Sequence, residues 1–443
     1  MKRFLSILVA VAFALTAIAQ SESRKDIDAH PHLANTTLSV YSGPYFFKPI
    51  AETPKGYKPF YISHYGRHGS RHEAHDWYVL SLVEMLESAD SMNILTPKGK
   101  ELKAMMIKIS EAHHDRYGEL TRAGFEQHKG IARRMYERFK PVFYRGAIID
   151  SRASDYTRCV LSMVAFNESL KECEPMLETR MDAAIQHKNV VRPTMPFLKD
   201  PRYTGRVITG TDDWWLRLCA WAEKHDFSHS CNLVFTNIEP LCKKYNRSMP
   251  SIMIDLYKRL DAVQNLGWHD RSFIDSIYSA DERHSIYLYE NYRWYCRYAT
   301  TSVENGYKRY APMQAMVNDI ISYADLAIEG KNSAAANLRF GHDYYILGLL
   351  AVLNCNEYPS GLDLSDVDKL NEKWSSYKMV TMASNLQIVF YRSKKQSDIL
   401  VRFLENENDI TLPIKSVEGP FYKWEDVRNY LNERMALICK WTK

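Results

Sequence analysis

The sequence predicts an α/β protein, a sheet flanked by helices, with a mostly helical domain inserted into it. Strand–helix units occur towards both ends of the chain, in residues 57–173 and 331–443, and such units typically build a sheet covered by helices. Between them, in residues 174–330, short strands are hard to find. Aromatic, leucine and charged residues recur there at spacings of three and four, which is the helical period. We therefore expect one α/β core interrupted by a helical insertion.

The first part of the predicted core combines one strand with several helices. A strand at 60–62 is followed by apolar residues at helical spacing in 76–87 and 97–109. A further helix is predicted within 118–139, where apolar residues recur on one face. His128 lies on that face, so we expect it to pack in the core rather than bind a ligand.

The later core elements continue the alternation of strand and helix. A polar stretch between the last two strands indicates a hairpin. The predicted strands are 146–150, 337–340, 386–391 and 399–404, and the predicted helices begin near 154 or span 345–353 and 424–440. Two of these strands lead directly into a helix, as in a sheet whose strands are connected by helices.

Residues 1–19 predict a signal peptide. A basic start precedes an apolar run and the small-residue pattern Ala17-Ile18-Ala19, which is typical of a cleavage site. We expect cleavage near Ala19 and an exported protein, periplasmic or secreted. The apolar run is too short to span a membrane comfortably, so no membrane span is expected. Residues 20–56 are polar and contain prolines, and we expect them to cross the surface as an N-terminal arm.

Composition narrows the classes of function. The chain has 443 residues, of which 46% are apolar, enough to bury a large core. Its formal net charge of +5 is mildly basic without a clustered basic stripe, so no nucleic-acid partner is expected. None of the eight cysteines has the CxxC spacing of zinc or redox motifs. Cys219, Cys231 and Cys242 are close enough along the chain for one disulfide, but their pairing and the oligomeric state stay open.

Basic residues and a histidine are concentrated directly after the strand at 60–62. Arg67, His68, Gly69 and Arg71 follow each other closely. The planar guanidinium fork fits phosphate oxygens, and a neutral imidazole is a nucleophile that needs little activation. Two nearby cations lower the pKa of His68 and keep its ring neutral, while Gly69 removes a side chain that would block close approach. The alternative is a structural histidine at a basic strand end.

Charged residues and a histidine also follow two other predicted strands. Arg158 lies in the first turn of the helix that follows the strand at 146–150, and His342 and Asp343 directly follow the strand at 337–340. Ligands bind at the carboxyl ends of strands in open α/β sheets, and helix N-termini favour anions. We therefore expect these side chains to meet His68 in one small anion-sized hollow.

These stretches resemble a known family. The pentapeptide RHGSR fits the RHGxR signature of the histidine acid phosphatases, the second branch of the histidine phosphatase superfamily. GELTRAG resembles a family helix that supports the sheet, and ASDYTRC and FGHD resemble the segments with the third phosphate-clamping arginine and the second histidine with its acid. LRFGHDYYILGLLAVL and SNLQIVFYRSKKQSDILVRFLENENDI are most similar to multiple inositol polyphosphate phosphatases, a subgroup of this family. A histidine phosphatase-like fold follows from the resemblance.

The resemblance implies a role for each matched residue. His68 would be the nucleophile that forms a phosphohistidine, and Asp343 would be the proton donor. The implied phosphate-binding residues are Arg67, Arg71, Arg158 and His342. Such a mechanism requires no metal and no cofactor, and its partner is a small phosphate monoester. His72-Glu73-Ala74-His75-Asp76 has a metal-like composition but is not HExxH, so no metal is expected there.

Two positions depart from the family patterns. Glu73 stands where the signature usually continues with a proline. Asp343 directly follows His342, and Tyr344 stands where many inositol polyphosphate phosphatases have the glutamate of a His-Ala-Glu triplet. In this detail the chain is similar to His-Asp phytases and acid phosphatases.

The expected function is an exported phosphomonoesterase for inositol polyphosphates such as phytate. The subgroup resemblance selects this substrate, whereas the charge of the chain does not. A broad-specificity acid phosphatase for sugar or nucleotide monoesters is the alternative within the same chemistry. An inactive protein that binds phosphate esters is the alternative from another class, against which the presence of all six expected site residues argues.

Overall fold

The protein is described by a computed structural model that covers residues 21–193, 213–299 and 310–440. The expected signal peptide at 1–19 lies outside these residues. Within the described ranges, no helix combines the length and the apolar character that crossing a membrane requires.

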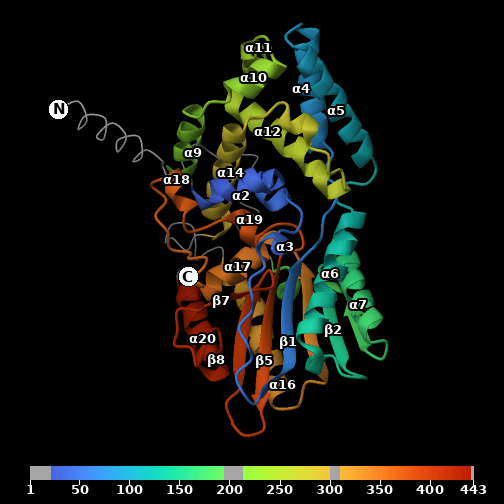
Figure 1. Cartoon of the computed structure of the whole chain (residues 1–443), viewed down its shortest axis with the longest axis vertical. Helices are drawn as coiled ribbons and strands as arrows, with labels where there is room; N and C mark the ends of the chain where they lie inside the picture. Colours follow the sequence, from blue (N-terminus) through green and yellow to red (C-terminus); the bar gives the residue numbers. More distant parts are fainter. Residues whose placement is uncertain (1–20, 194–212, 300–309, 441–443) are drawn as a thin grey trace, which may run out of the picture.

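A mixed sheet of eight strands forms the lower half of the molecule (Figure 1). The strand order is β3-β2-β4-β1-β5-β6-β7, with β8 paired to β6. The parallel strands are β3 (Glu178–Asp182), β2 (Ile148–Ala153), β4 (Ala334–Gly341) and β1 (Tyr57–Arg67). The strands added in antiparallel orientation are β5 (Asn385–Ser393), β6 (Leu400–Glu405), β7 (Asn408–Ile410) and β8 (Tyr422–Lys423). The predicted α/β class and the β5–β6 hairpin are confirmed.

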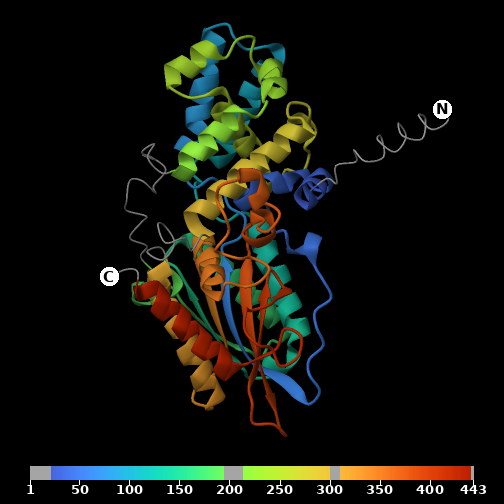
Figure 2. The ribbon, with the colours of Figure 1, turned by 90° about the vertical axis from the view of Figure 1, so that its left-hand side faces the viewer.

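Helices cover both faces of this sheet (Figures 1 and 2). One face carries α6 (Arg122–Arg138) and α7 (Thr157–Cys173), which pack with Ile62 of β1 in one apolar cluster. Tyr61 and Tyr65 belong to the cluster on the opposite face. The helices in that second cluster are α16 (Gln314–Ile328), α17 (Asp343–Leu353) and α20 (Trp424–Lys440). Neighbouring residues of β1 therefore alternate between the two faces, as the pleat of a strand requires.

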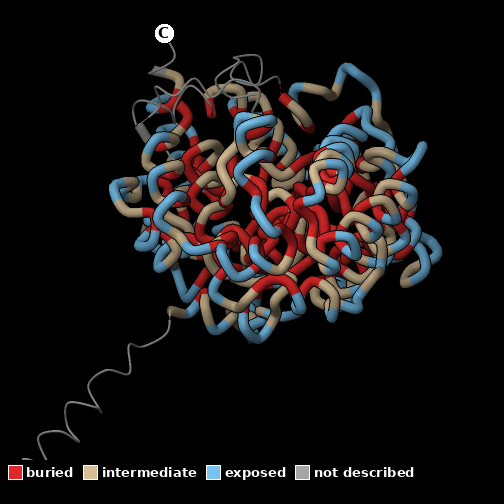
Figure 3. The backbone as a smooth tube through the Cα atoms, turned by 90° about the horizontal axis from the view of Figure 1, so that it is seen from above, coloured by how far each residue is buried: buried red, intermediate tan, exposed pale blue. Residues whose placement is uncertain are grey.

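A helical layer lies above the sheet (Figure 1). Its helices are α4 (Trp77–Ser91), α5 (Pro97–His113), α9 (Asp213–Glu223), α10 (Ser228–Val234), α11 (Glu239–Tyr245), α12 (Met249–Asp261), α13 (Ser272–Asp275) and α14 (Ala280–Trp294). Short helical elements also occur elsewhere along the chain. They are α8 (Lys188–Val191), α18 (Val367–Leu370), α19 (Ser376–Met379), η2 (Lys140–Val142), η3 (Ile185–His187), η5 (Ala262–Leu266), η6 (Tyr295–Ala299) and η7 (Ala311–Met313). Seen from above, buried backbone runs through the middle of the molecule and exposed backbone surrounds it (Figure 3).

Apolar packing and strand pairing group the helices and strands differently from the predicted core (57–173 and 331–443) and insertion (174–330). Helices α4 and α5 come from the predicted core, but they share an apolar cluster with α10, α12 and α14 of the insertion. Strand β3 comes from the predicted insertion, yet it pairs with β2 at the edge of the sheet. It was missed because its five residues are mostly exposed and show no apolar alternation.

The expectation that residues 20–56 cross the surface is wrong for residues 33–43, which are mostly buried, whereas residues 44–56 are mostly exposed. The segment forms α2 (Glu22–Ala29), η1 (Pro31–Leu38) and α3 (Gly43–Phe46), and α2 and η1 lie between the sheet and the helical layer. Leu33 is 0% exposed, and the side-chain amide of Asn35 donates to the Lys258 carbonyl of α12 at 2.9 Å. Ile27, Leu33 and Ala34 are buried because two other layers close over them, which a polar average composition does not indicate.

The three clustered cysteines form no disulfide. Cys219, Cys231 and Cys242 are free thiols in the structure. Burial raises the pKa of Cys231 to about 11, so this thiol stays protonated at neutral pH.

We expect Leu33→Ala to destabilise the protein, because the substitution leaves a cavity between three packed layers. The free energy of unfolding should fall by about 2–5 kcal/mol, measured by urea denaturation. Leu80→Ala is the matched control, since Leu80 is 45% exposed, and it should change that free energy by less than about 0.5 kcal/mol. Equal effects of the two substitutions would contradict a buried arm.

Candidate active site

Three neighbouring parallel strands end at the same level of the sheet. In the register, Arg67 of β1 lies opposite Gly341 of β4, and Ala153 of β2 lies opposite Phe340 of β4. Just beyond the strands, the His68 amide donates to the Gly341 carbonyl at 2.9 Å. The three predicted site segments therefore leave the sheet side by side, at the edge where α/β sheets bind ligands.

His68 is buried, and its hydrogen bond defines which ring nitrogen is free. Its Nδ1 lies 2.9 Å from the Gly69 carbonyl oxygen. Because a carbonyl only accepts, Nδ1 carries the proton and Nε2 keeps a lone pair. The rings of His68 and His342 are 5.6 Å apart, edge to face. The two imidazoles thus lie together, as the sequence predicted.

The pKa of His68 is lowered well below its ordinary value of 6.5. Burial is the largest cause, followed by the positive charges of Arg158 and Arg67. The direction agrees with the sequence-based expectation, but that expectation named only the cations. Burial was not foreseen because the sequence does not show that the loop is covered.

Arg67 is held by three segments that are far apart in the sequence. Its Nη1 donates to the carbonyl oxygens of Thr37, at 2.7 Å, and of Val380, at 2.8 Å. Its Nη2 lies 2.9 Å from Oδ2 of Asp343. A guanidinium has five N–H donors, and Nε of Arg67 has no protein partner. The side chain is therefore fixed in place and still presents donors.

Arg71 and Arg158 are within electrostatic range of His68. Nη1 of Arg71 donates to the His72 carbonyl at 2.8 Å, and burial lowers the pKa of Arg71 to about 10, so it remains charged at neutral and acidic pH. Arg158 lies in the first turn of α7 and stacks over the Tyr156 ring at 4.5 Å. Three guanidinium groups thus surround one imidazole.

His342 and Asp343 begin α17 next to this cluster. His342 is the N-cap residue, and its Nε2 lies 3.2 Å from the Ser154 hydroxyl after β2. Burial and the charge of Arg158 lower the pKa of His342 well below 6.5. The ring of Tyr344 is stacked near that of His342 at 5.9 Å. All six predicted side chains therefore gather at one place, although their catalytic roles stay predictions.

Gly69 is required for a different reason from the predicted one. A Cβ at this position would lie 2.5 Å from the Gly124 carbonyl oxygen of α6, which no real Cβ tolerates. The absence of a side chain thus lets α6 approach the loop from behind. The same helix holds the loop through Gln127, whose Oε1 accepts from the Ser70 amide at 2.8 Å.

Comparison with solved structures gives a clear match in fold. Multiple inositol polyphosphate phosphatase from Bifidobacterium longum, in complex with inositol hexasulfate, matches with a TM-score of 0.71 at 17% identity, over 90% of this chain and 97% of that one. The chain has this phosphatase fold. The phytase from D. castellii matches with a TM-score of 0.61 at 12% identity, over 91% and 85%. Klebsiella sp ASR1 phytase matches with a TM-score of 0.51 at 15% identity, over 85% and 96%.

No family model matches the chain, and no curated protein matches it in sequence. The predicted histidine phosphatase-like fold with its flanking helices is nevertheless confirmed by the solved structures.

One basic residue near the site was missed in the sequence. Arg192 follows α8, stacks over Tyr156 at 5.0 Å and pairs with Asp155 at 2.8 Å. Its charge contributes to the lowered pKa of His342. A lone arginine outside any motif carries no sequence signal, so only the folding of α8 against β4 reveals it.

The metal-like segment that follows the loop of residues 67–71 is used for packing. Nδ1 of His72 lies 3.1 Å from Nδ1 of His113, and the ring of His75 stacks on Trp77. Across the part of the chain that the structure describes, no three His, Cys, Asp or Glu side chains are grouped to hold a metal. His128 is buried against Phe340, as expected of a packing residue.

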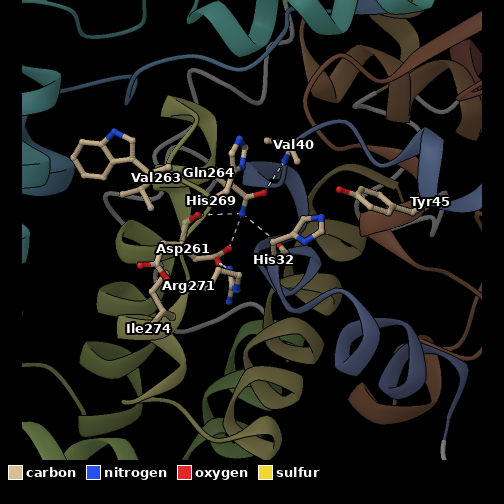
Figure 4. A pocket seen from close by; sticks show the side chains of 11 residues that line it. His32, Val40, Tyr45, Asp261, Val263, Gln264, His269, Arg271 and Ile274 are labelled. Carbon is tan, nitrogen blue, oxygen red and sulfur yellow. Dashed lines mark hydrogen bonds and ion pairs between the residues drawn. The ribbon is translucent and has the colours of Figure 1, made fainter.

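A cavity of about 250 Å³ lies between the arm and α12–α13 (Figure 4). Gln264 is at its centre, accepting from the Val40 amide at 2.9 Å and donating to Asp261 at 2.8 Å. The next residue, Asn265, donates to the Leu38 carbonyl and accepts from the Ser70 hydroxyl, both at 2.7 Å. These hydrogen bonds connect the arm and the helical layer to Ser70 in the loop of residues 67–71.

We expect the His68 ring to stay neutral from pH 7.5 down to pH 5, because burial and nearby cations disfavour its charged form. NMR of protein labelled with ¹⁵N-histidine should show this, with the His68 signals assigned by comparison with His68→Gln. The urea-unfolded chain is the control and should titrate near about pH 6.5.

The unfolded chain takes up this proton and the native one does not, so the free energy of unfolding should fall as pH drops below about 6.5. A native His68 that titrates near that pH would contradict the burial described here.

Proposed function

We propose that the chain is a phosphomonoesterase that hydrolyses inositol polyphosphates through a phosphohistidine at His68. One observation supports the proposal: His68 is buried with its Nδ1 against a carbonyl oxygen, and burial together with the positive charges of three guanidinium groups lowers its pKa. Such a nucleophile in a cationic hollow suits attack on a phosphate ester, because the cations stabilise negative charge on the transferring group.

In the first step, Nε2 of His68 attacks phosphorus in line, and the bond between phosphorus and the ester oxygen breaks. Arg67 can donate from Nε and from Nη2, while Arg71 and Arg158 neutralise the remaining non-bridging oxygens and the neutral ring of His342 can donate one hydrogen bond. The donors are held in place before the substrate arrives, so little reorganisation is needed as charge develops.

Asp343 moves the proton in both steps. As an acid it protonates the leaving alkoxide, and as a base it then takes a proton from the water that attacks the phosphohistidine. The P–N bond then breaks, which regenerates the free imidazole of His68 and releases inorganic phosphate. The carboxylate lies 2.9 Å from Nη2 of Arg67, and a bound phosphate that takes this donor would free the carboxyl group to carry the proton.

The choice of inositol polyphosphates is supported by the fold. The Bifidobacterium protein with the same fold is a multiple inositol polyphosphate phosphatase solved with inositol hexasulfate. A substrate with several phosphates also suits Arg192, a cation beside the cluster that the reacting phosphate does not require. Export remains part of this proposal, supported by the composition of residues 1–19.

We expect the protein without residues 1–19 to release phosphate from phytate faster than from glucose 1-phosphate or AMP, measured as initial rates at several pH values. His68→Ala should abolish release, because no other group can form the intermediate. His229→Ala, an exposed histidine on α10, is the control and should be unchanged.

Equal rates on the three substrates would favour a broad-specificity acid phosphatase. No release from any of them, with calorimetric binding of inositol hexasulfate intact, would favour a binding protein.

Asp343→Asn should slow phytate hydrolysis by about 10²–10⁴-fold, because the alkoxide then leaves without a proton. Turnover of p-nitrophenyl phosphate should fall much less, since p-nitrophenolate is a good leaving group. Steady-state kinetics on both substrates give the comparison. If both rates fell equally, Asp343 would not be the proton donor.

A further inference from the structure

A buried carboxylate lies between the phosphate loop and the helical layer. Oε1 of Glu73 is 2.6 Å from Nη1 of Arg259 on α12, and Oε2 is 3.9 Å from Nη1 of Arg71. The Glu73 side chain is 4% exposed, that of Arg259 is 9% exposed and that of Arg71 is 12% exposed. One carboxylate thus faces two guanidinium groups, and only Arg71 belongs to the loop.

The two contacts are unequal. Arg259 donates a short, charge-assisted hydrogen bond to Glu73, whereas Arg71 is only within ion-pair distance and Oε2 has no hydrogen-bond partner. Coulomb attraction decreases with distance, so Arg259 neutralises most of the carboxylate. Arg71 consequently keeps the larger part of its positive charge for a phosphate.

Both members of the short pair are held in position. The Glu73 carbonyl accepts from the Gly118 amide at 2.6 Å, which fixes the backbone beneath the side chain. The guanidinium of Arg259 stacks over the Tyr78 ring at 4.6 Å. The geometry of the pair is therefore determined by α12 and by the segment after the loop, not by Arg71.

Removal of Arg259 would leave Glu73 with a single cationic neighbour. A buried unpaired carboxylate is costly, so Glu73 would turn to Arg71 and compete with phosphate for its donors. We propose that Arg259 is a positioning residue, which keeps Arg71 available for phosphate by holding the Glu73 carboxylate away from it. The proposal rests on the function proposed above only in taking Arg71 as a phosphate ligand.

A double-mutant cycle tests this coupling, with binding of inorganic phosphate measured by calorimetry and kcat and KM measured on phytate. Arg259→Met should weaken phosphate binding by about tenfold, as expected for coupled neighbours, and should raise KM more than it lowers kcat. Glu73→Gln combined with Arg259→Met should restore binding to within about threefold of the unmodified protein, because the competing charge is gone.

The neighbouring residue on α12 provides a matched control. Lys258 is also buried and forms an ion pair with Glu290 at 3.0 Å, away from the loop. Lys258→Met should lower the unfolding temperature and leave phosphate binding unchanged. Arg259→Lys keeps the positive charge and should retain most of the binding, so it carries the test if Arg259→Met does not fold.

A purely structural role for Arg259 predicts that the double variant binds phosphate more weakly than Arg259→Met, and this result would overturn the inference. Unchanged phosphate binding in a folded Arg259→Met protein would overturn it as well. If the unmodified protein neither bound phosphate nor hydrolysed phytate, the proposed function would fail instead, so the two failures are distinguishable.

Discussion

The site depends on the register of three adjacent parallel strands. Because β2, β4 and β1 end at the same level, the segments that begin at Ser154, His342 and His68 leave the sheet side by side. Two of these segments continue directly into helices whose N-termini favour an anion. A slip of one residue in either pairing would turn these side chains to the other face of the sheet and separate the imidazole from the cations.

Two carboxylates offset the positive charge of the site. Three guanidiniums close together in a buried place repel one another, and the structure offsets this with Asp343 beside Arg67 and Glu73 beside Arg71. The two carboxylates differ in which other groups hold them. In the proposed mechanism Asp343 exchanges its contact with Arg67 for a proton-transfer role, whereas Glu73 keeps its ion pair with Arg259.

The layers of the molecule meet at the loop of residues 67–71. The arm contributes the Thr37 carbonyl to Arg67, α6 supports Gly69 and Ser70 from behind, and the helical layer reaches the loop through Asn265 and Arg259. Each contact is short and buried, so the loop geometry is determined by several segments together. This explains why side chains remote in the sequence can affect a site made of a few residues.

The sequence by itself determined the α/β class, most helices and strands, and the identity of the six side chains that gather at the strand ends. These follow from local signals: apolar periodicity within an element, and a polar motif directly after a strand. Only the tertiary structure decided that burial is the main reason for a neutral His68, that Gly69 faces α6, and that Arg192 and Arg259 lie near the site. Such properties arise from contacts between distant segments, which leave no periodic or local trace along the chain.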